Sequence, residues 1–241
     1  ERQITSDSSE QDTPAICGNL IVWEDWRNVQ DSDENVDIYL YDLAAGQERA
    51  LITNPATQRN PAIHGSRIVW EDNRSGNWDI YMYDLASGTE TQITSDSGDQ
   101  CNPAVYGDRI VWEDWRNENG DIYMFDIQTG AEKPITDDPG YQYLPAIYGD
   151  RVVWEDYRNG PGDIYLYNLA TGQEIRVTTD PNDQYLTSIF MNRIVWEDNR
   201  HGNTDIYVFD LTSGREYRVT ADPSDLFAPV IYGDTVVWYD W

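Results

Sequence analysis

The sequence predicts an all-β chain built from six copies of one four-stranded antiparallel unit. Three observations predict this class: a tryptophan recurs at fixed spacing, β-branched and aromatic segments alternate with turn residues, and no segment has a helical period. The recurring tryptophans are Trp23, Trp70, Trp112, Trp154, Trp196 and Trp238, and every interval after Trp70 is 42 residues. Because repeats of roughly 40 to 45 residues with four short strands are typical of propeller blades, we expect a six-bladed β-propeller.

Each repeat contains four strand-like segments bounded by Gly, Pro, Asn or Asp. A version of Pro-Ala-Ile-Tyr-Gly-Asp-Arg-Ile-Val-Trp-Glu-Asp-x-Arg, as at residues 145–158, supplies the first and second strands. Asp-Ile-Tyr-x-Tyr-Asp-Leu supplies the third strand, and a segment ending in Ile-Thr or Val-Thr supplies the fourth. In the second strand Ile68 and Trp70 point to one side and Val69 to the other, so the strand is apolar on both faces. We therefore expect sheets that are covered on both sides.

The strand count predicts one β-propeller domain over residues 1–241. Residues 229–241 supply a first and a second strand, residues 1–5 supply a fourth, and no remaining segment supplies a third. We therefore expect a closing blade that is shared by the N- and C-terminal segments and lacks its third strand in the sequence shown. We expect that strand to be lost from one end or replaced by another element. The expected blades are about 14–53, 61–94, 103–136, 145–178 and 187–220, with the closing blade formed by 229–241 and 1–5.

The charge balance excludes several partners. The chain of 241 residues has 44 acidic and 16 basic side chains, a formal net charge of −28. Such a chain repels phosphate backbones, so we expect no nucleic acid partner. It also has no run of about 18 apolar residues, so we expect no direct membrane insertion. Cys17 and Cys101 are too few for a disulfide scaffold and are expected to be free thiols.

The motif Arg-Ile-Val-Trp-Glu-Asp-x-Arg, followed by Asp-Ile-Tyr-x-Tyr-Asp-Leu-x-x-Gly and Ile-Thr, resembles the TolB-type, WD-repeat-like β-propeller repeat over essentially the whole chain. That family has a Ser-Pro-Asp-Gly turn where this sequence has Tyr148, Gly149 and Asp150, and it usually has Phe where Trp stands here. The variant resembles tandem propellers of archaeal cell-surface proteins. The resemblance implies the fold, whereas the function differs between members: similar propellers serve as docking platforms, peptidase lids or lyases.

Aspartates and arginines recur with the tryptophan, as in Trp154, Asp156 and Arg158, and the third strand opens with another aspartate, as at Asp163. We interpret these residues as Arg-carboxylate pairs that brace the hairpin between the second and third strands, because the planar guanidinium can hold two oxygens. A side chain that recurs in every copy serves the repeat. Binding residues are therefore expected among the positions that vary.

Variable connections gather at one end of the sheets, because strand alternation places the second-to-third and fourth-to-first connections together. Aromatic residues stand there two positions before the first-strand proline or directly after the second strand. Such rings could stack on sugars or anchor a peptide, and packing between blades is the alternative explanation. The candidate ligand-binding residues are Tyr143, Tyr185, Phe227, Trp26, Trp115 and Tyr157.

An acidic insertion in the first repeat places oxygen ligands at alternate positions, which resembles the start of a calcium loop. The candidate ligands are Asp31, Asp33, Asn35 and Asp37. Val36 stands where such a loop has glycine, and no glutamate stands at the twelfth position, so a solvated acidic loop is the alternative. Apart from Ca²⁺, no cofactor is expected.

The sequence lacks the motifs of a hydrolase. It contains no Gly-x-Ser-x-Gly, and its two histidines, His64 and His201, are expected at opposite ends of the sheets. We therefore expect a non-enzymatic extracellular, cell-surface or periplasmic module that docks a protein partner, or a neighbouring copy, through its variable acidic-aromatic face. A glycan-binding module is the alternative. A polysaccharide-degrading enzyme is a further one, since carboxylate pairs are available among 44 acids.

Overall fold

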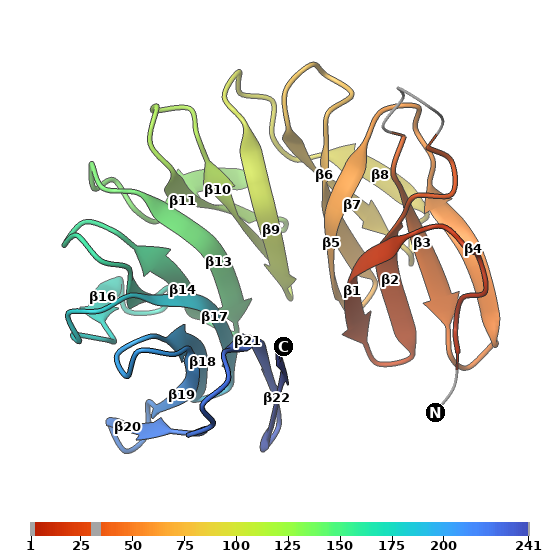
Figure 1. Ribbon diagram of the computed structural model, residues 1–241. Helices are drawn as coiled ribbons and strands as arrows, with labels where there is room; N and C mark the ends of the chain where they lie inside the picture. Colours follow the sequence, from red (N-terminus) through yellow and green to blue (C-terminus); the bar gives the residue numbers. More distant parts are fainter. Residues whose placement is uncertain (1–2, 30–34, 241) are drawn as a thin grey trace. The chain divides into compact units, whose positions relative to one another are not determined.

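The chain consists of strands and turns. The computed structural model describes residues 3–29 and 35–240, which contain no helix (Figure 1); within those ranges nothing could cross a bilayer as a helix. The strands form five four-stranded sheets and one two-stranded sheet. This confirms the all-β class and the four-stranded antiparallel unit. The chain divides into two compact units, residues 1–118 with 125–131, and residues 119–124 with 132–241.

Within the first unit, two complete sheets follow one another along the chain, each with its strands in sequential order. The strands of the first sheet are β1 (Gln11–Cys17), β2 (Leu20–Asp25), β3 (Asp37–Asp42) and β4 (Gln47–Ile52), and those of the second are β5 (Gln58–His64), β6 (Arg67–Asp72), β7 (Asp79–Asp84) and β8 (Thr89–Gln92). A third sheet contains the points at which the chain passes between units: β9 (Gln100–Tyr106), β10 (Arg109–Asp114), β11 (Asp121–Asp126) and β12 (Ala131–Pro134).

The second unit holds two further complete sheets and the two-stranded one. The complete sheets are β13 (Gln142–Tyr148), β14 (Arg151–Asp156), β15 (Asp163–Asn168) and β16 (Gln173–Arg176), then β17 (Gln184–Phe190), β18 (Arg193–Asp198), β19 (Asp205–Asp210) and β20 (Arg215–Arg218). The two-stranded sheet consists of β21 (Leu226–Tyr232) and β22 (Thr235–Asp240).

The core lies between neighbouring sheets. Val153 and Trp154 point to opposite faces of β14 and are both fully buried, whereas every residue of the outer strand β16 is exposed. One apolar cluster joins Val153 and Ile164 to Trp196 and Tyr207 of the next sheet. Burial on both faces is therefore a consequence of stacking sheet against sheet, as the apolar second strand predicts.

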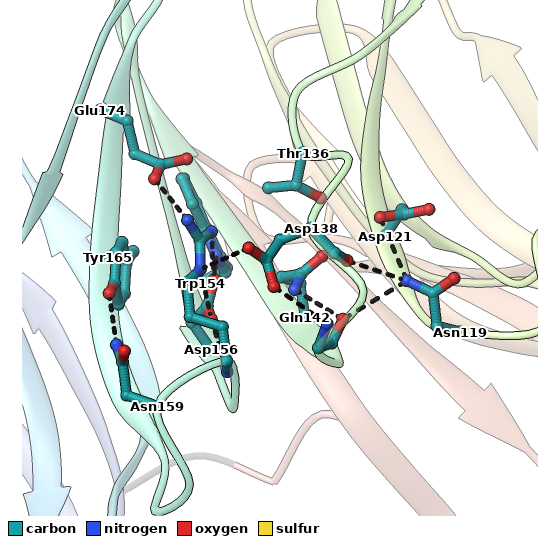
Figure 2. A network of polar contacts seen from close by, with 12 residues as sticks. Asn119, Asp121, Thr136, Asp138, Gln142, Trp154, Asp156, Asn159, Tyr165 and Glu174 are labelled. Atoms are coloured by element: carbon teal, nitrogen blue, oxygen red, sulfur yellow. Dashed lines mark hydrogen bonds and ion pairs between the residues drawn. The ribbon is translucent and has the colours of Figure 1, made fainter.

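The recurring Trp, Asp and Arg form one network in each complete sheet. In β14 the Trp154 indole donates to Asp156 at 2.9 Å, and the Arg158 guanidinium donates to both oxygens of that carboxylate, at 2.8 and 2.6 Å (Figure 2). Arg158 also reaches Glu174 on β16 at 2.8 Å. The expected Arg-carboxylate pair is thus confirmed, with one difference. Asp163 pairs with Arg176 of the fourth strand, because its position faces β16.

A β-bulge shapes each first strand that the structure describes. In β13 the pairing register shifts between Tyr143 and Ala146, and Leu144 adopts a positive φ of 49°. Pairing continues beyond the bulge, so β13 begins at Gln142 rather than at the expected residue 145. A bulge turns one residue's N–H out of the ladder and makes it available to a neighbouring sheet. The residues with positive φ at this position are Thr13, Asn60, Asn102, Leu144, Leu186 and Ala228.

The last sheet differs from the expected closing blade. Residues 3–5, the described part of the fourth strand expected over residues 1–5, form no strand. The physical reason is that a fourth strand needs a third strand to pair with, and the described residues provide β22 with no partner other than β21. The single domain over residues 1–241 and the closing of the ring stay predictions.

Candidate binding face

The predicted first-strand candidates share one position. We call the recurring tryptophan of each second strand the framework tryptophan. The residue after it pairs with the second residue of the first strand, as Glu155 does with Tyr143 and Glu197 with Tyr185. Phe227 pairs in the same way with Tyr239. These side chains therefore lie at the end of the sheets where the variable connections gather.

Tyr141, Tyr143 and Tyr157, which we name the tyrosine cluster, come together in the second unit. The rings of Tyr141 and Tyr143 are 5.7 Å apart and nearly parallel, with an interplanar angle of 7°. The ring of Tyr157 meets that of Tyr143 edge-on at 5.6 Å. Tyr143 and Tyr157 are half-buried, and Tyr141 is 46% exposed. The cluster thus combines two predicted candidates with a third ring that the sequence analysis did not select.

Two glycines make room for these rings. A Cβ on Gly120 would lie 3.3 Å from the Tyr143 ring, and one on Gly162 would lie 3.1 Å from the Tyr157 ring. In the second repeat the corresponding position is Trp78, which instead stacks under the Arg59 guanidinium at 3.9 Å. Glycine just before the third strand was therefore the sequence signal that distinguishes the tyrosine cluster from the equivalent position in the first unit.

Carboxylates surround the tyrosine cluster. The Tyr157 hydroxyl donates to Glu155 at 3.4 Å, and Asp183 accepts the Gly162 N–H at 2.9 Å. Burial, together with the negative charges of Glu155 and Asp183, raises the pKa of Tyr157 above its ordinary value. The phenol therefore stays protonated and neutral at physiological pH. The site offers aromatic surface and hydrogen-bond donors beside fixed negative charge, which suits a cationic or hydrogen-bonding ligand.

The other predicted aromatic residues have separate surroundings. Tyr185 lies within hydrogen-bond distance of Thr204, with 3.3 Å between the hydroxyl oxygens, and Phe227 lies 5.9 Å from the ring of Tyr239. Trp26 and Trp115 belong to the first unit and are half-buried; the indole nitrogen of Trp26 is buried with no hydrogen-bond partner among the described residues. Ligand contact by these four residues stays a prediction.

Asparagine side-chain amides on the second-to-third connections donate hydrogen bonds to backbone oxygens of the fourth-to-first connections. The Asn119 amide nitrogen donates to the backbone oxygens of Asp138 and Gly140, at 3.1 and 3.3 Å, and thereby holds the loop that precedes Tyr141 (Figure 2). Asn77 and Asn203 make the equivalent pair of bonds in their repeats. The position two residues before the third strand thus fixes loop geometry on this face.

The Asn119→Ala variant is expected to loosen this loop, because the Asp138 carbonyl loses the amide that it accepts from and the Gly140 carbonyl keeps only the Gln142 amide. We expect a loss of about 1 to 2 kcal/mol in unfolding free energy and faster chymotrypsin cleavage after Tyr141. Limited proteolysis with mass spectrometry measures the second effect. The Asn159→Ala variant is the control, since that amide donates to the Tyr165 hydroxyl and not to the loop. Equal cleavage rates in both variants would contradict this role of Asn119.

The acidic insertion is described only in part. Asp31 and Asp33 lie outside the described residues. In the amide orientation that satisfies its surroundings, Asn35 donates to the backbone oxygens of Asn54 and Ala56, which is the framework role of Asn119. Asp37 is buried and accepts from Asn28 at 2.5 Å. Across residues 3–29 and 35–240, no three or more His, Cys, Asp or Glu side chains are grouped as metal ligands. The calcium site stays a prediction.

A set of buried glutamates, each directly after one of the recurring tryptophans, was not predicted from the sequence. They are at most 5% exposed: Glu24, Glu71, Glu113, Glu155 and Glu197. The carboxylate accepts the N–H that the bulge of the next sheet turns outward, at 2.7 Å from Asn60 to Glu24 and 2.5 Å from Ala228 to Glu197. Asn102 and Leu186 donate likewise to Glu71 and Glu155. The recurrence was visible in the sequence, but a charged residue near a strand end is ordinarily expected in solvent.

Glu24, Glu71, Glu155 and Glu197 fasten neighbouring sheets within each unit, and the last two thereby hold the first strands that carry Tyr185 and Phe227. Burial raises the pKa of Glu71, and it raises the pKa of Glu197 to about 7. Oε2 of Glu197 is buried and has no hydrogen-bond partner among the described residues. Glu71 differs because its Oε1 also accepts from the Asn60 amide at 2.7 Å.

Both histidines have framework contacts. Nδ1 of His64 accepts the Gly107 N–H at 3.0 Å in the first unit, and Nε2 of His201 lies 2.9 Å from the Tyr207 hydroxyl in the second unit. The free thiols of Cys17 and Cys101 are half-buried, and burial beside Glu71 and Glu113 raises the pKa of Cys101. That thiol therefore stays protonated.

No protein-family model matches the chain, and no curated protein sequence matches it. Solved structures do. TolB from Acinetobacter baumannii superposes with a TM-score of 0.69 at 17% identity, over 94% of this chain and 58% of that one. An acylaminoacyl peptidase from Pyrococcus horikoshii gives 0.73 at 15% identity, over 96% of this chain and 43% of that one. The β-propeller domain of the trilobed protease from Pyrococcus furiosus gives 0.70 at 15% identity, over 97% and 81%.

These similarities show that the chain has the fold of TolB-like β-propellers. The chain spans a little over half the length of that TolB and less than half of the peptidase. At such low identity the activities of those proteins are not carried over.

Proposed function

We propose that the chain is a non-catalytic binding propeller of the extracellular space, cell surface or periplasm, which docks a protein partner through the face that carries the tyrosine cluster. The observation that carries this proposal is Tyr141, a 46% exposed ring stacked on Tyr143. Tyrosine is one of the residue types enriched at binding hot spots, and stacking on Tyr143 holds this ring in place. The proposal includes six blades in a closed ring, with the closing blade shared between the two ends of the chain.

The charge of the face determines the class of partner. Glu155 and Asp183 lie beside the cluster, and the chain has a net charge of −28. We therefore expect a partner segment with Lys or Arg, whose cation can lie over a tyrosine ring while carboxylates attract it. Because such attraction is screened by salt, binding should weaken as ionic strength rises.

The test is selection of a displayed peptide library on the 241-residue chain, followed by affinity measurement of the enriched peptides. We expect cationic peptides whose affinity falls at least tenfold in the Tyr141→Ala variant, because the exposed ring supplies the contact surface. The matched control is Tyr217→Ala, since Tyr217 is 48% exposed on β20, outside the variable face. Enriched peptides that bind equally well to Tyr141→Ala would exclude this face as the docking site.

A glycan ligand is the second candidate, favoured by the nearly parallel rings of Tyr141 and Tyr143. Such a platform suits the apolar face of a sugar ring. A glycan array, probed with the parent chain and the same two variants, distinguishes the two candidates. The glycan is the ligand if sugars bind the parent and Tyr217→Ala but not Tyr141→Ala, and if no peptides are enriched. This result would exclude the protein partner.

A further inference from the structure

The outer strand β22 exposes residues that are buried everywhere else in the fold. Val237 is 56% exposed and Trp238 is 41% exposed, whereas the corresponding Val195 and Trp196 of β18 are fully buried. The same two positions of β2, β6, β10 and β14 are at most 3% exposed. Within the part of the chain that the structure describes, β22 pairs with β21 alone (Figure 1).

The other sheets show what covers a second strand. In β18 and β19, Trp196 pairs with Tyr207, Glu197 with Ile206 and Asp198 with Asp205. The same Trp-Tyr, Glu-Ile and Asp-Asp register occurs between β2 and β3, between β6 and β7, and between β14 and β15. The ring centroids of the Trp-Tyr pair are 6.0 Å apart in the sheets of β6, β14 and β18. A third-strand segment is therefore the repeated partner of the second strand's outer edge, and its tyrosine is the repeated neighbour of the tryptophan.

The backbone of β22 is oriented for such pairing. Tyr232 pairs with Thr235 around a two-residue turn, so Thr235 faces β21. Because strand residues alternate in direction, the N–H and C=O groups of Val236, Trp238 and Asp240 point to the opposite edge. The sheet of β18 shows the same alternation at odd and even positions. The backbone N–H of Asn199 donates to the backbone oxygen of Asp183 on the first-strand side, whereas the backbone oxygen of Asn192 accepts the Leu211 N–H on the third-strand side.

We propose that the open edge of β22 is a strand-addition site. Its occupant is an extended segment with the third-strand pattern, an aspartate followed by an aliphatic residue, a tyrosine, a second aliphatic residue and an aromatic residue. The segment pairs antiparallel with Val236, Trp238 and Asp240, and its tyrosine covers Trp238. Backbone hydrogen bonds supply affinity in this mode and the alternating side chains supply specificity. A second copy pairing through its own β22 would place Trp238 opposite no tyrosine, and two chains of charge −28 repel each other.

The test uses a fluorescein-labelled peptide of residues 203–212, titrated against the 241-residue chain by fluorescence anisotropy. We expect saturable binding and slowed hydrogen exchange in β22. The Val236→Pro variant removes one outward N–H at an edge position where proline is tolerated, and it should weaken binding at least tenfold. The matched Val236→Thr variant keeps that N–H and should bind as the parent does. The same peptide N-methylated at the tyrosine keeps its side chains and should not bind.

Three results would overturn the proposal. The first is a peptide that fails to bind the parent. The second is a peptide that binds equally well after N-methylation, because this means side-chain contact without strand pairing. The third is a parent chain that is dimeric by light scattering and becomes monomeric in Val236→Pro, because a second copy then occupies the edge. The N-methylated peptide keeps the test valid even where Val236→Pro unfolds the hairpin.

Discussion

Replacing Asp156 by alanine should lower the free energy of unfolding by about 3 to 5 kcal/mol, the usual cost of removing one partner of a buried ion pair. Asp156 is fully buried and accepts from the Trp154 indole, from the Arg158 backbone and from both ends of its guanidinium. Without the carboxylate, the buried indole N–H loses its acceptor, and the guanidinium keeps only the partly exposed carboxylates of Glu174 and Asp138. Urea unfolding, followed by circular dichroism, measures the change.

The control for this prediction is Asp234→Ala. Asp234 also forms an ion pair, with Arg193 at 2.6 Å, but its side chain is 92% exposed. Exposed pairs contribute little because water and salt screen them, so this variant should unfold at nearly the parent's urea midpoint. If the two alanine variants lose the same free energy of unfolding, burial does not explain the contribution of the Trp-Asp-Arg network to stability.

The Glu197→Gln variant should gain stability relative to the parent as pH rises from about 4.5 to about 7. In the folded chain burial raises the pKa of Glu197 to about 7, from an ordinary value of 4.5. Between these values the unfolded chain ionises Glu197 while the folded chain holds it protonated, so parent stability falls as pH rises. Glutamine has no such charge and still accepts the Ala228 N–H. The relative gain is up to about 3 kcal/mol, from about 1.4 kcal/mol per pKa unit.

Thermal unfolding of both chains at pH 4, 5, 6, 7 and 8 measures this difference. The Glu216→Gln variant is the control, because that side chain is about one third exposed and bound to Arg200; it should not gain stability with pH. A constant difference between Glu197→Gln and the parent over the whole range would show that Glu197 has the same pKa in the folded and unfolded chains, against the raised pKa.

The binding face was predictable only in part. Tyr143 and Tyr157 were identifiable because they vary where the rest of the repeat is constant, and the structure brings them together. Tyr141 was not, since a tyrosine in a loop has no periodic signal, and its stacking on Tyr143 depends on the loop that Asn119 holds. Glu197 and its equivalents were missed for the opposite reason, because they are constant and their partners lie in the next sheet.

The repeat alone specified the four-stranded unit, its strand order and the apolar second strand, because these depend on neighbours within about 40 residues of chain, where alternation and turn residues act locally. Contacts between sheets were decided only by the tertiary structure. The bulge at Leu186 turns its N–H toward Glu155, and Gly162 leaves space for the Tyr157 ring. Such contacts join segments whose spacing in the sequence says nothing about their distance in space. Burial in these contacts then raises the pKa of a carboxyl group such as Glu197 or of a phenol such as Tyr157.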